Sequence, residues 1–179
     1  MKTKLATPRN ILLFLYGIFV TSGISLAAEK TNLTQSQSSD KPAKNSALSF
    51  GGERHDFKLK GGHKAFIILP KSDAATSWKN RPWIWYAPTF VPKGLPGREL
   101  EWLFPRLLEA GFGIAGVDVG ESCGSPAGRK IYSQLHRVVV KKYNFASKAC
   151  LLPQSRGGLM LYNWAVEHPD QVQCIGGIY

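Results

Sequence analysis

Residues 149–160 read Ala-Cys-Leu-Leu-Pro-Gln-Ser-Arg-Gly-Gly-Leu-Met, an apolar run that ends in a serine and two glycines. The run 149–152 predicts a buried strand. Residues 156–168 predict a helix with one apolar stripe, formed by Leu159, Tyr162 and Val166. Ser155 therefore falls on a tight strand-to-helix turn, where the backbone is strained and where a large side chain at Gly157 would collide with the neighbouring chain.

The rest of the chain also carries strand patterns. Residues 56–59 and 65–69 flank Lys60-Gly61-Gly62 and predict an antiparallel hairpin, because glycine tolerates the positive φ of a tight turn. The continuous apolar run 83–87, ended by Pro88, predicts a strand buried on both faces. Two further strands are predicted at 112–119 and 172–179.

Helix patterns separate these strands. Leucines recur at helical spacing over 98–110, and Gly111 follows as a C-terminal cap, whereas Pro105 predicts a kink or a delayed start. Ser125-Pro126 predicts the N-cap and first turn of the next helix, whose apolar residues are Ile131, Leu135, Val138 and Val139. This alternation predicts a three-layer α/β domain with a mostly parallel sheet and an N-terminal antiparallel hairpin.

Residues 111–116 spell G-x-G-x-x-G, the dinucleotide-binding fingerprint. That motif requires a strand before it and a helix after it, so that the pyrophosphate meets a helix N-terminus. Here a predicted helix comes first and a predicted strand contains the glycines. We therefore expect them to end the helix and permit close packing, and we expect no cofactor.

The N-terminal 49 residues predict an export signal and a tether. Residues 1–28 combine a basic start, an apolar stretch from 11 to 24 and small residues suited to cleavage, which is typical of a secretory signal peptide. An uncleaved membrane anchor is the alternative, although the stretch is shorter than the ~20 residues of a spanning helix. Residues 29–49 are polar and predict a flexible linker. The predicted location is secreted or periplasmic.

The chain carries a net charge of +11, of which +8 remains after removal of the predicted signal. A net positive charge of this size is typical of proteins that bind nucleic acid, so nucleic acid has to be considered as a partner. The cations are scattered along the sequence, however, in the groups Lys58, Lys60 and Lys64; Arg129 and Lys130; and Arg137, Lys141 and Lys142. No basic run is interleaved with aromatic residues, so we predict a solvated surface and no nucleic-acid partner.

Cys123, Cys150 and Cys174 make an odd number of cysteines for an exported protein. Cys150 and Cys174 fall inside apolar strand patterns and are expected to pack in the core, whereas Cys123 is the exposed candidate. None shows the spacing of a metal site, so we expect no bound metal.

Ser155 is the candidate nucleophile. The turn would present its hydroxyl above the carboxyl ends of the strands, and the backbone N–H of Arg156, at a helix N-terminus, would stabilise a developing oxyanion. A second donor would come from the loop after the strand 83–87. Pro88 has no N–H, so Thr89 is the first candidate and Phe90 the second.

The chain from residue 50 to residue 179 resembles the α/β-hydrolase superfamily, and within it an exported bacterial branch of esterase-like and prolyl-oligopeptidase-like enzymes. The resemblance rests on the predicted hairpin and on Trp-Tyr-Ala-Pro-Thr-Phe at 85–90, Asp-Val-Gly-Glu-Ser-Cys-Gly-Ser-Pro at 118–126, Gln-Ser-Arg-Gly-Gly at 154–158 and Leu-Tyr-Asn-Trp-Ala at 161–165. It implies that Ser155 forms an acyl-enzyme with a small-molecule ester and that water is the final acceptor. Pro153 stands where the family usually has glycine.

The family places its acid and its histidine after the serine. Only His168 and Asp170 follow Ser155, and a helix would carry His168 nearly 20 Å away at ~1.5 Å per residue. We therefore predict a fragment, incomplete at its C-terminus, that lacks the acid and histidine of the triad and is inactive alone. A non-catalytic binding protein and a flavodoxin-like or dinucleotide-binding module are the alternatives. The sequence leaves the oligomeric state open.

Overall fold

A computed structural model of the chain describes residues 48–71 and 80–179. The predicted signal peptide, 1–28, and the predicted linker up to residue 47 lie outside the described residues. The last two linker residues already contact the domain. Leu48 packs against the core, its carbonyl accepts a hydrogen bond from Arg54 Nη1 at 2.8 Å, and the Ser49 carbonyl accepts one from the Gly52 N–H at 2.9 Å.

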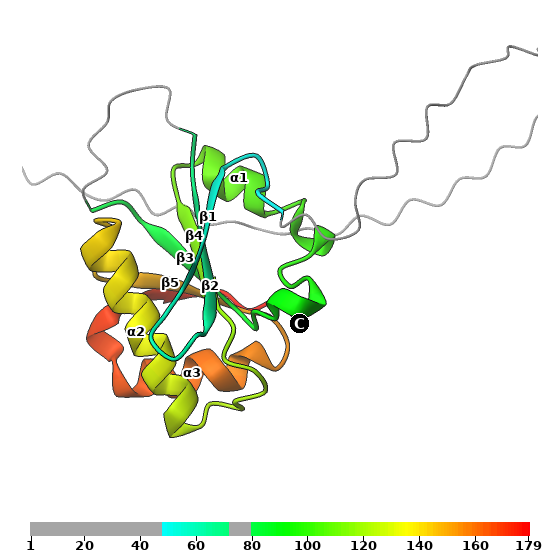
Figure 1. Cartoon of the computed structure of the whole chain (residues 1–179). Helices are drawn as coiled ribbons and strands as arrows, with labels where there is room; N and C mark the ends of the chain where they lie inside the picture. The colour runs from blue at the N-terminus through cyan, green and yellow to red at the C-terminus, as the bar shows by residue number, and fades with distance from the viewer. Residues whose placement is uncertain (1–47, 72–79) are drawn as a thin grey trace, which may run out of the picture. The chain divides into compact units, whose positions relative to one another are not determined.

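The described residues form a six-stranded sheet in the order β1-β2-β4-β3-β5-β6 (Figure 1). Its strands are β1 Glu53–Lys58, β2 Lys64–Leu69, β3 Trp83–Ala87, β4 Gly113–Val117, β5 Ala149–Pro153 and β6 Val172–Ile175. β1 and β2 form the predicted antiparallel hairpin, and β2 also pairs antiparallel with β4. The pairs β3–β4, β3–β5 and β5–β6 are parallel, so the predicted mostly parallel sheet is confirmed.

Helices cover both faces of this sheet (Figure 1). The α-helices are α1 Phe104–Glu109, α2 Pro126–Lys142 and α3 Gly157–Glu167, and the 3₁₀ helices are η1 Val91–Lys93, η2 Arg98–Leu100 and η3 Pro169–Gln171. One apolar cluster joins α1 to the sheet, and a larger one joins α2 and α3 to it. The predicted three-layer arrangement is therefore confirmed.

The helix predicted over 98–110 is only half α-helical. Residues Arg98–Leu100 form η2, and α1 begins at Phe104 with Pro105 in its first turn. Proline lacks the N–H that a helix interior needs but fits a first turn, so it delays the helix rather than kinking it. Gly111 follows α1 with φ +86°, as expected of a C-terminal cap.

The start of α2 matches its sequence pattern. Ser125 Oγ accepts a hydrogen bond from the Gly128 N–H at 3.3 Å, and Pro126 occupies the first turn. The buried face of α2 carries Tyr132, Leu135, His136 and Val139, so two polar aromatic residues join the predicted apolar stripe.

Aromatic side chains dominate the core beneath α2 and α3. The ring centroids of Trp83 and Trp85 lie 5.2 Å apart, and those of Trp85 and Trp164 lie 4.6 Å apart. Tyr132 meets Trp85 edge-on at 5.5 Å. The Trp83 Nε1–H donates to the Ala146 carbonyl at 2.9 Å, which satisfies a polar group that burial would otherwise leave unpaired.

The buried face of α3 differs from the prediction. Met160, Leu161 and Trp164 face the core, whereas the predicted stripe lies outward, with Leu159 56% and Val166 81% exposed. Apolar residues surround most of α3, so spacing alone did not select a face. The close packing of Gly157 against β3 sets the rotation of the helix and turns Trp164 inward.

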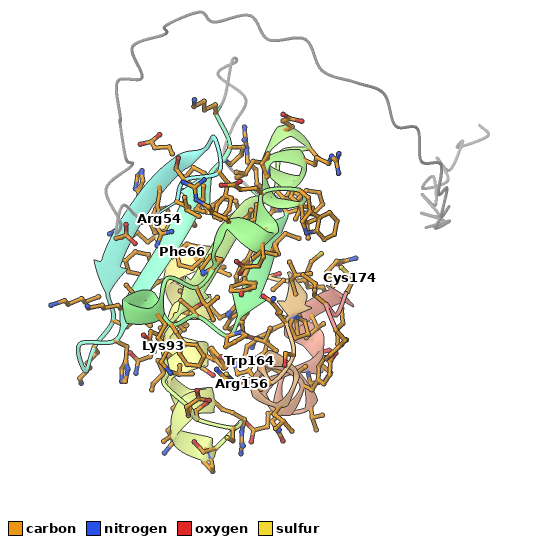
Figure 2. All side chains as sticks on the ribbon, turned by 90° about the vertical axis from the view of Figure 1, so that its right-hand side faces the viewer. Arg54, Phe66, Lys93, Arg156, Trp164 and Cys174 are labelled. Atoms are coloured by element: carbon orange, nitrogen blue, oxygen red, sulfur yellow. The ribbon has the colours of Figure 1, made fainter. Side chains whose placement is uncertain are left out.

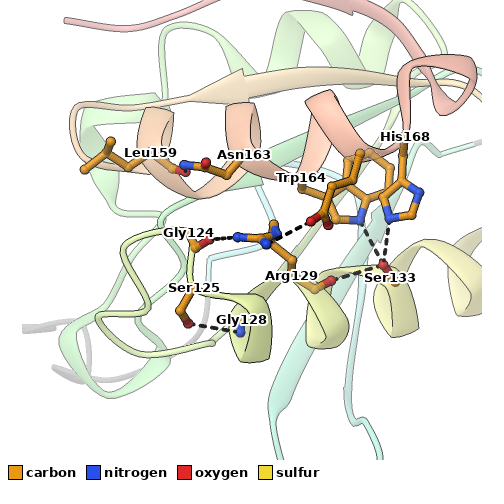
Figure 3. A network of polar contacts seen from close by, with 10 residues as sticks. Gly124, Ser125, Gly128, Arg129, Ser133, Leu159, Asn163, Trp164 and His168 are labelled. Carbon is orange, nitrogen blue, oxygen red and sulfur yellow. Dashed lines mark hydrogen bonds and ion pairs between the residues drawn. The ribbon is translucent and has the colours of Figure 1, made fainter.

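Polar contacts join α2 to α3 (Figure 3). Arg129 donates to the Gly124 carbonyl and forms an ion pair with Glu167 at 2.8 Å. One turn further along α2, Ser133 Oγ accepts a hydrogen bond from Trp164 Nε1 at 3.0 Å. These contacts fix the end of α3 that lies furthest from Ser155.

The glycines of the G-x-G-x-x-G pattern serve packing. The pattern comes after a helix and not before a helix N-terminus, as predicted: Gly111 follows α1, and β4 contains Gly113 and Gly116. A Cβ at Gly113 would lie 2.5 Å from the Phe145 ring, and one at Gly116 would lie 2.8 Å from Phe66. The pattern therefore reflects a crowded strand.

Cys150 and Cys174 are register partners on β5 and β6. Cys150 is half-buried, and burial together with the neighbouring Cys174 raises the pKa of its thiol to about 12. The prediction that both pack in the core is wrong for Cys174, which is exposed because the side chains of β6 are mostly uncovered. Cys123 is exposed, as predicted.

His136 predicts acid sensitivity of the fold. It is 8% exposed and its Nε2–H donates to the Ser147 carbonyl at 2.8 Å. Burial, only partly offset by that hydrogen bond, lowers the pKa of the imidazole below its usual value. The unfolded chain therefore takes up a proton first as the pH falls through about 6.5, and stability is lost below that pH.

We expect the midpoint temperature of thermal unfolding to be lower at pH 5.5 than at pH 7.5. The decrease should be smaller in His136→Gln, whose amide retains a donor for the Ser147 carbonyl. His63→Gln, in the β1–β2 turn, is the control and should retain the full pH dependence. Equal pH dependence in the wild type and His136→Gln would contradict the assignment.

Candidate active site

Ser155 follows β5 after one intervening residue, Gln154, and is exposed, with φ +49°. This left-handed conformation is strained for a residue with a Cβ and persists only where neighbours hold it. The Gln154 N–H donates to the Ala87 carbonyl at 2.7 Å, and the Ser155 N–H donates to the Ile178 carbonyl at 3.0 Å. The turn is therefore pinned to segments on both sides of β5.

Gly157 allows this turn to approach β3. A Cβ at Gly157 would lie 2.7 Å from the Pro88 nitrogen and would overlap the Ala87 carbonyl. Ala87 is also the register partner of Pro153, the last residue of β5. The serine turn and the loop after β3 are therefore packed backbone against backbone, as the sequence pattern predicted for Gly157.

Arg156 comes between Ser155 and the first residue of α3. Among the described residues, no backbone carbonyl accepts a hydrogen bond from its N–H. The side chain runs away from the helix, with the guanidinium 5.1 Å from the centre of the Phe90 ring and 3.3 Å from Glu121. The backbone N–H thus remains at the helix N-terminus, where it can meet an anion.

Thr89 follows β3 and is almost fully buried. Its hydroxyl reaches the Tyr86 carbonyl at 3.5 Å and packs against Gly116 of β4, so the side chain faces the core. A contribution to an oxyanion hole would therefore come from the backbone N–H. Within the described part of the chain this N–H, too, donates to no backbone carbonyl.

Two carboxylates, neither of them a predicted site residue, hold the loop after β3. Asp118 accepts a hydrogen bond from the Val91 N–H at 3.2 Å. The Glu121 carboxylate lies 3.3 Å from the Arg156 guanidinium and 4.0 Å from the Lys93 ammonium. The Lys93 ammonium lies 5.1 Å from the Phe90 ring centre. Figure 2 labels Lys93 and Arg156. The position of the two carboxylates just beyond the carboxyl end of β4 was the available signal, because loops at this edge of a sheet surround its sites.

Tyr86 supports the turn from below. Its hydroxyl donates to Gln154 Oε1 at 2.6 Å. Burial, with a smaller contribution from Glu99, raises the pKa of the Tyr86 hydroxyl far above its usual value. The phenol therefore stays neutral and orients the residue before Ser155.

The four histidines of the chain lie away from Ser155. His168 ends α3 as predicted, 4.7 Å from Trp164 between ring centres and 3.3 Å from Ser133 Oγ (Figure 3). His136 contacts Ser147, His55 pairs with Glu53 at 2.8 Å, and His63 lies in the β1–β2 turn. Within residues 48–71 and 80–179, Ser155 has no histidine beside it.

The described residues contain no group of three His, Cys, Asp or Glu side chains that could hold a metal ion. The helices in this same part of the chain are too short or too polar to cross a membrane.

Solved structures share this architecture. FphF, a fluorophosphonate-binding serine hydrolase of Staphylococcus aureus, superposes with a TM-score of 0.56 and 12% identity over 69% of this chain and 54% of its own. A cold-adapted esterase from an Arctic intertidal metagenomic library gives a TM-score of 0.55, 10% identity and coverages of 71% and 58%. A thermostable esterase superposes with a TM-score of 0.52 and 13% identity, over 70% of this chain and 40% of its own.

The chain has the α/β-hydrolase fold. It spans about half the length of these structural neighbours, from 40% to 58%. No protein-family model matches the sequence, and no curated protein matches it. At 10% to 13% identity the likeness concerns the fold alone, and the activity of this domain has to be argued from its own residues.

Gly157→Ala tests the packing of the serine turn. The added Cβ must displace either β3 or α3, so we expect the free energy of unfolding to fall by about 2–4 kcal/mol. Gly176→Ala is the matched control, because a Cβ there meets no atom within 4 Å, and it should change stability by less than about 0.5 kcal/mol. Chemical denaturation measures both, and equal stability of the two variants would contradict the packing argument.

Proposed function

We propose that this domain belongs to an exported serine hydrolase that cleaves small-molecule carboxylic esters, with Ser155 as the nucleophile. The conformation of Ser155 is the observation that carries the proposal. An exposed serine at φ +49°, between a buried strand and a helix whose first residue must be glycine, supports the assignment of a nucleophile elbow.

The reaction would use the groups around this turn. Ser155 Oγ attacks the ester carbonyl carbon, and its proton passes to a general base. The backbone N–H groups of Arg156 and Thr89 are the proposed donors to the tetrahedral oxyanion. Collapse releases the alcohol and leaves an acyl-enzyme, which water then hydrolyses to the acid and free Ser155.

The surrounding charges support this assignment. The Arg156 guanidinium pairs with Glu121 and lies beside the Phe90 ring. The side chain therefore does not cover the backbone N–H of Arg156 at the start of α3. Asp118 holds the Val91 N–H and thereby the loop that carries Thr89. These contacts support the proposal that both donors are held in place before substrate binds, which is how such donors gain their effect.

Fluorophosphonate labelling tests the nucleophile. No histidine of the described residues faces Ser155, so imidazole is added to the buffer as an external base. We expect a covalent adduct on Ser155, detected by mass spectrometry, with a rate that rises with imidazole concentration. Ser155→Ala should lower the rate at least about 100-fold, since it removes the nucleophile itself.

Ser147→Ala is the control for nonspecific reaction, because this exposed serine lies outside the proposed site. In Ser147→Ala, fluorophosphonate should label Ser155 at the same rate as in the wild type. An adduct on other serines alone, or unchanged labelling of Ser155→Ala, would refute the proposed nucleophile.

A non-catalytic binding protein is the second candidate. The observation that favours it is that His136 and His168 form hydrogen bonds with Ser147 and Ser133, away from Ser155, so neither is placed to act as its base. In that case Ser155 would stay unlabelled at every imidazole concentration, although the fold is intact.

A further inference from the structure

Cations that lie far apart in the sequence come together beside α2. The end of β1 and the turn after it lie next to the second half of the helix, and together they line an open groove of about 700 Å³. Five of its eight lining residues are basic: Lys58, Lys60, Arg137, Lys141 and Lys142. No carboxylate lines this groove among the described residues. These five cations, which come from two separate segments of the sequence, therefore share one surface.

The side chains of this basic groove are available to a ligand. All five cations are exposed. Among the described residues, Lys142 alone of the five has an aromatic neighbour, with its ammonium 5.6 Å from the Tyr143 ring centre. Five like charges around one groove repel one another, and the repulsion is relieved when an anionic ligand binds.

A second groove of about 520 Å³ continues the first along α2. The two share Gln134 and Arg137, and the second adds Lys130. Its one lining carboxylate, Glu167, forms an ion pair with Arg129 at 2.8 Å, so that charge is neutralised. The basic track follows a helix of 17 residues, about 25 Å long, which suits an extended chain rather than a compact ion.

The lining favours one class of polyanion. Among the described residues, no exposed large apolar side chain lies on α2 or on the β1–β2 turn. Besides the half-buried Tyr143, whose ring lies beside Lys142, the described residues of the track offer no aromatic platform of the kind on which single-stranded nucleic acids stack, and no exposed large apolar residue of the kind that inserts into membranes. The choice among polyanions also rests on the proposed export of the domain, because an exported protein meets the acidic polysaccharides of cell surfaces.

We propose that the basic track along α2 and the β1–β2 turn binds an acidic polysaccharide. Spaced lysine and arginine side chains pair with successive carboxylates of the polymer. Counterion release contributes, so binding weakens as salt rises. The track lies apart from Ser155 and shares no lining residue with the serine turn.

The test is binding of the full chain to polygalacturonate, measured by calorimetry at low salt and at 0.15 M salt. We expect affinity that falls with salt, no binding of neutral dextran, and weaker binding of duplex DNA and of vesicles containing anionic lipid. Arg137→Glu/Lys141→Glu should weaken binding about 10-fold, and the milder pair Arg137→Gln/Lys141→Gln about threefold, since each exposed ion pair contributes modestly.

Lys71→Glu/Arg106→Glu is the matched control, because it changes the net charge equally at exposed residues outside the track. It should weaken binding less than twofold. Equal weakening by the track variant and this control would overturn the proposal, as would tighter binding of DNA or vesicles. Ser155→Ala should bind polygalacturonate like the wild type, so failure of the track and failure of the proposed nucleophile are separate results.

Discussion

The contact between Gly157 and the end of β3 is the constraint on which the rest of the site depends. A glycine at this position lets the start of α3 touch the Ala87 carbonyl, where any side chain would overlap it. That approach places the serine turn beside the loop after β3. It also sets the rotation of α3, and so determines that Trp164 rather than Val166 enters the core.

The aromatic core stabilises this arrangement from beneath the sheet. Trp85 of β3 packs against Trp164 of α3 and Tyr132 of α2, so one strand ties both helices together. Large aromatic side chains bury much apolar surface and have few conformations, which gives a rigid support at low entropic cost. A strained residue such as Ser155 requires a rigid support of this kind.

The two faces of α2 have different roles. Its inner face contributes Tyr132 and Leu135 to the core. Its outer face carries the exposed residues Arg137 and Lys141, whose charges remain in contact with solvent. The helix thus holds the sheet on one side while it presents a positive surface on the other, at a distance from the serine turn.

The sequence by itself determined the order of the elements, the hairpin, the class of sheet and the position of Ser155, because periodicity, proline and glycine act over a few residues. Pro105 delayed α1 as its missing N–H requires. Only the tertiary structure decided which face of α3 is buried, how Asp118 and Glu121 hold the loop after β3, and that distant cations share one groove. These features depend on contacts between segments far apart in the chain, and no local pattern encodes such contacts.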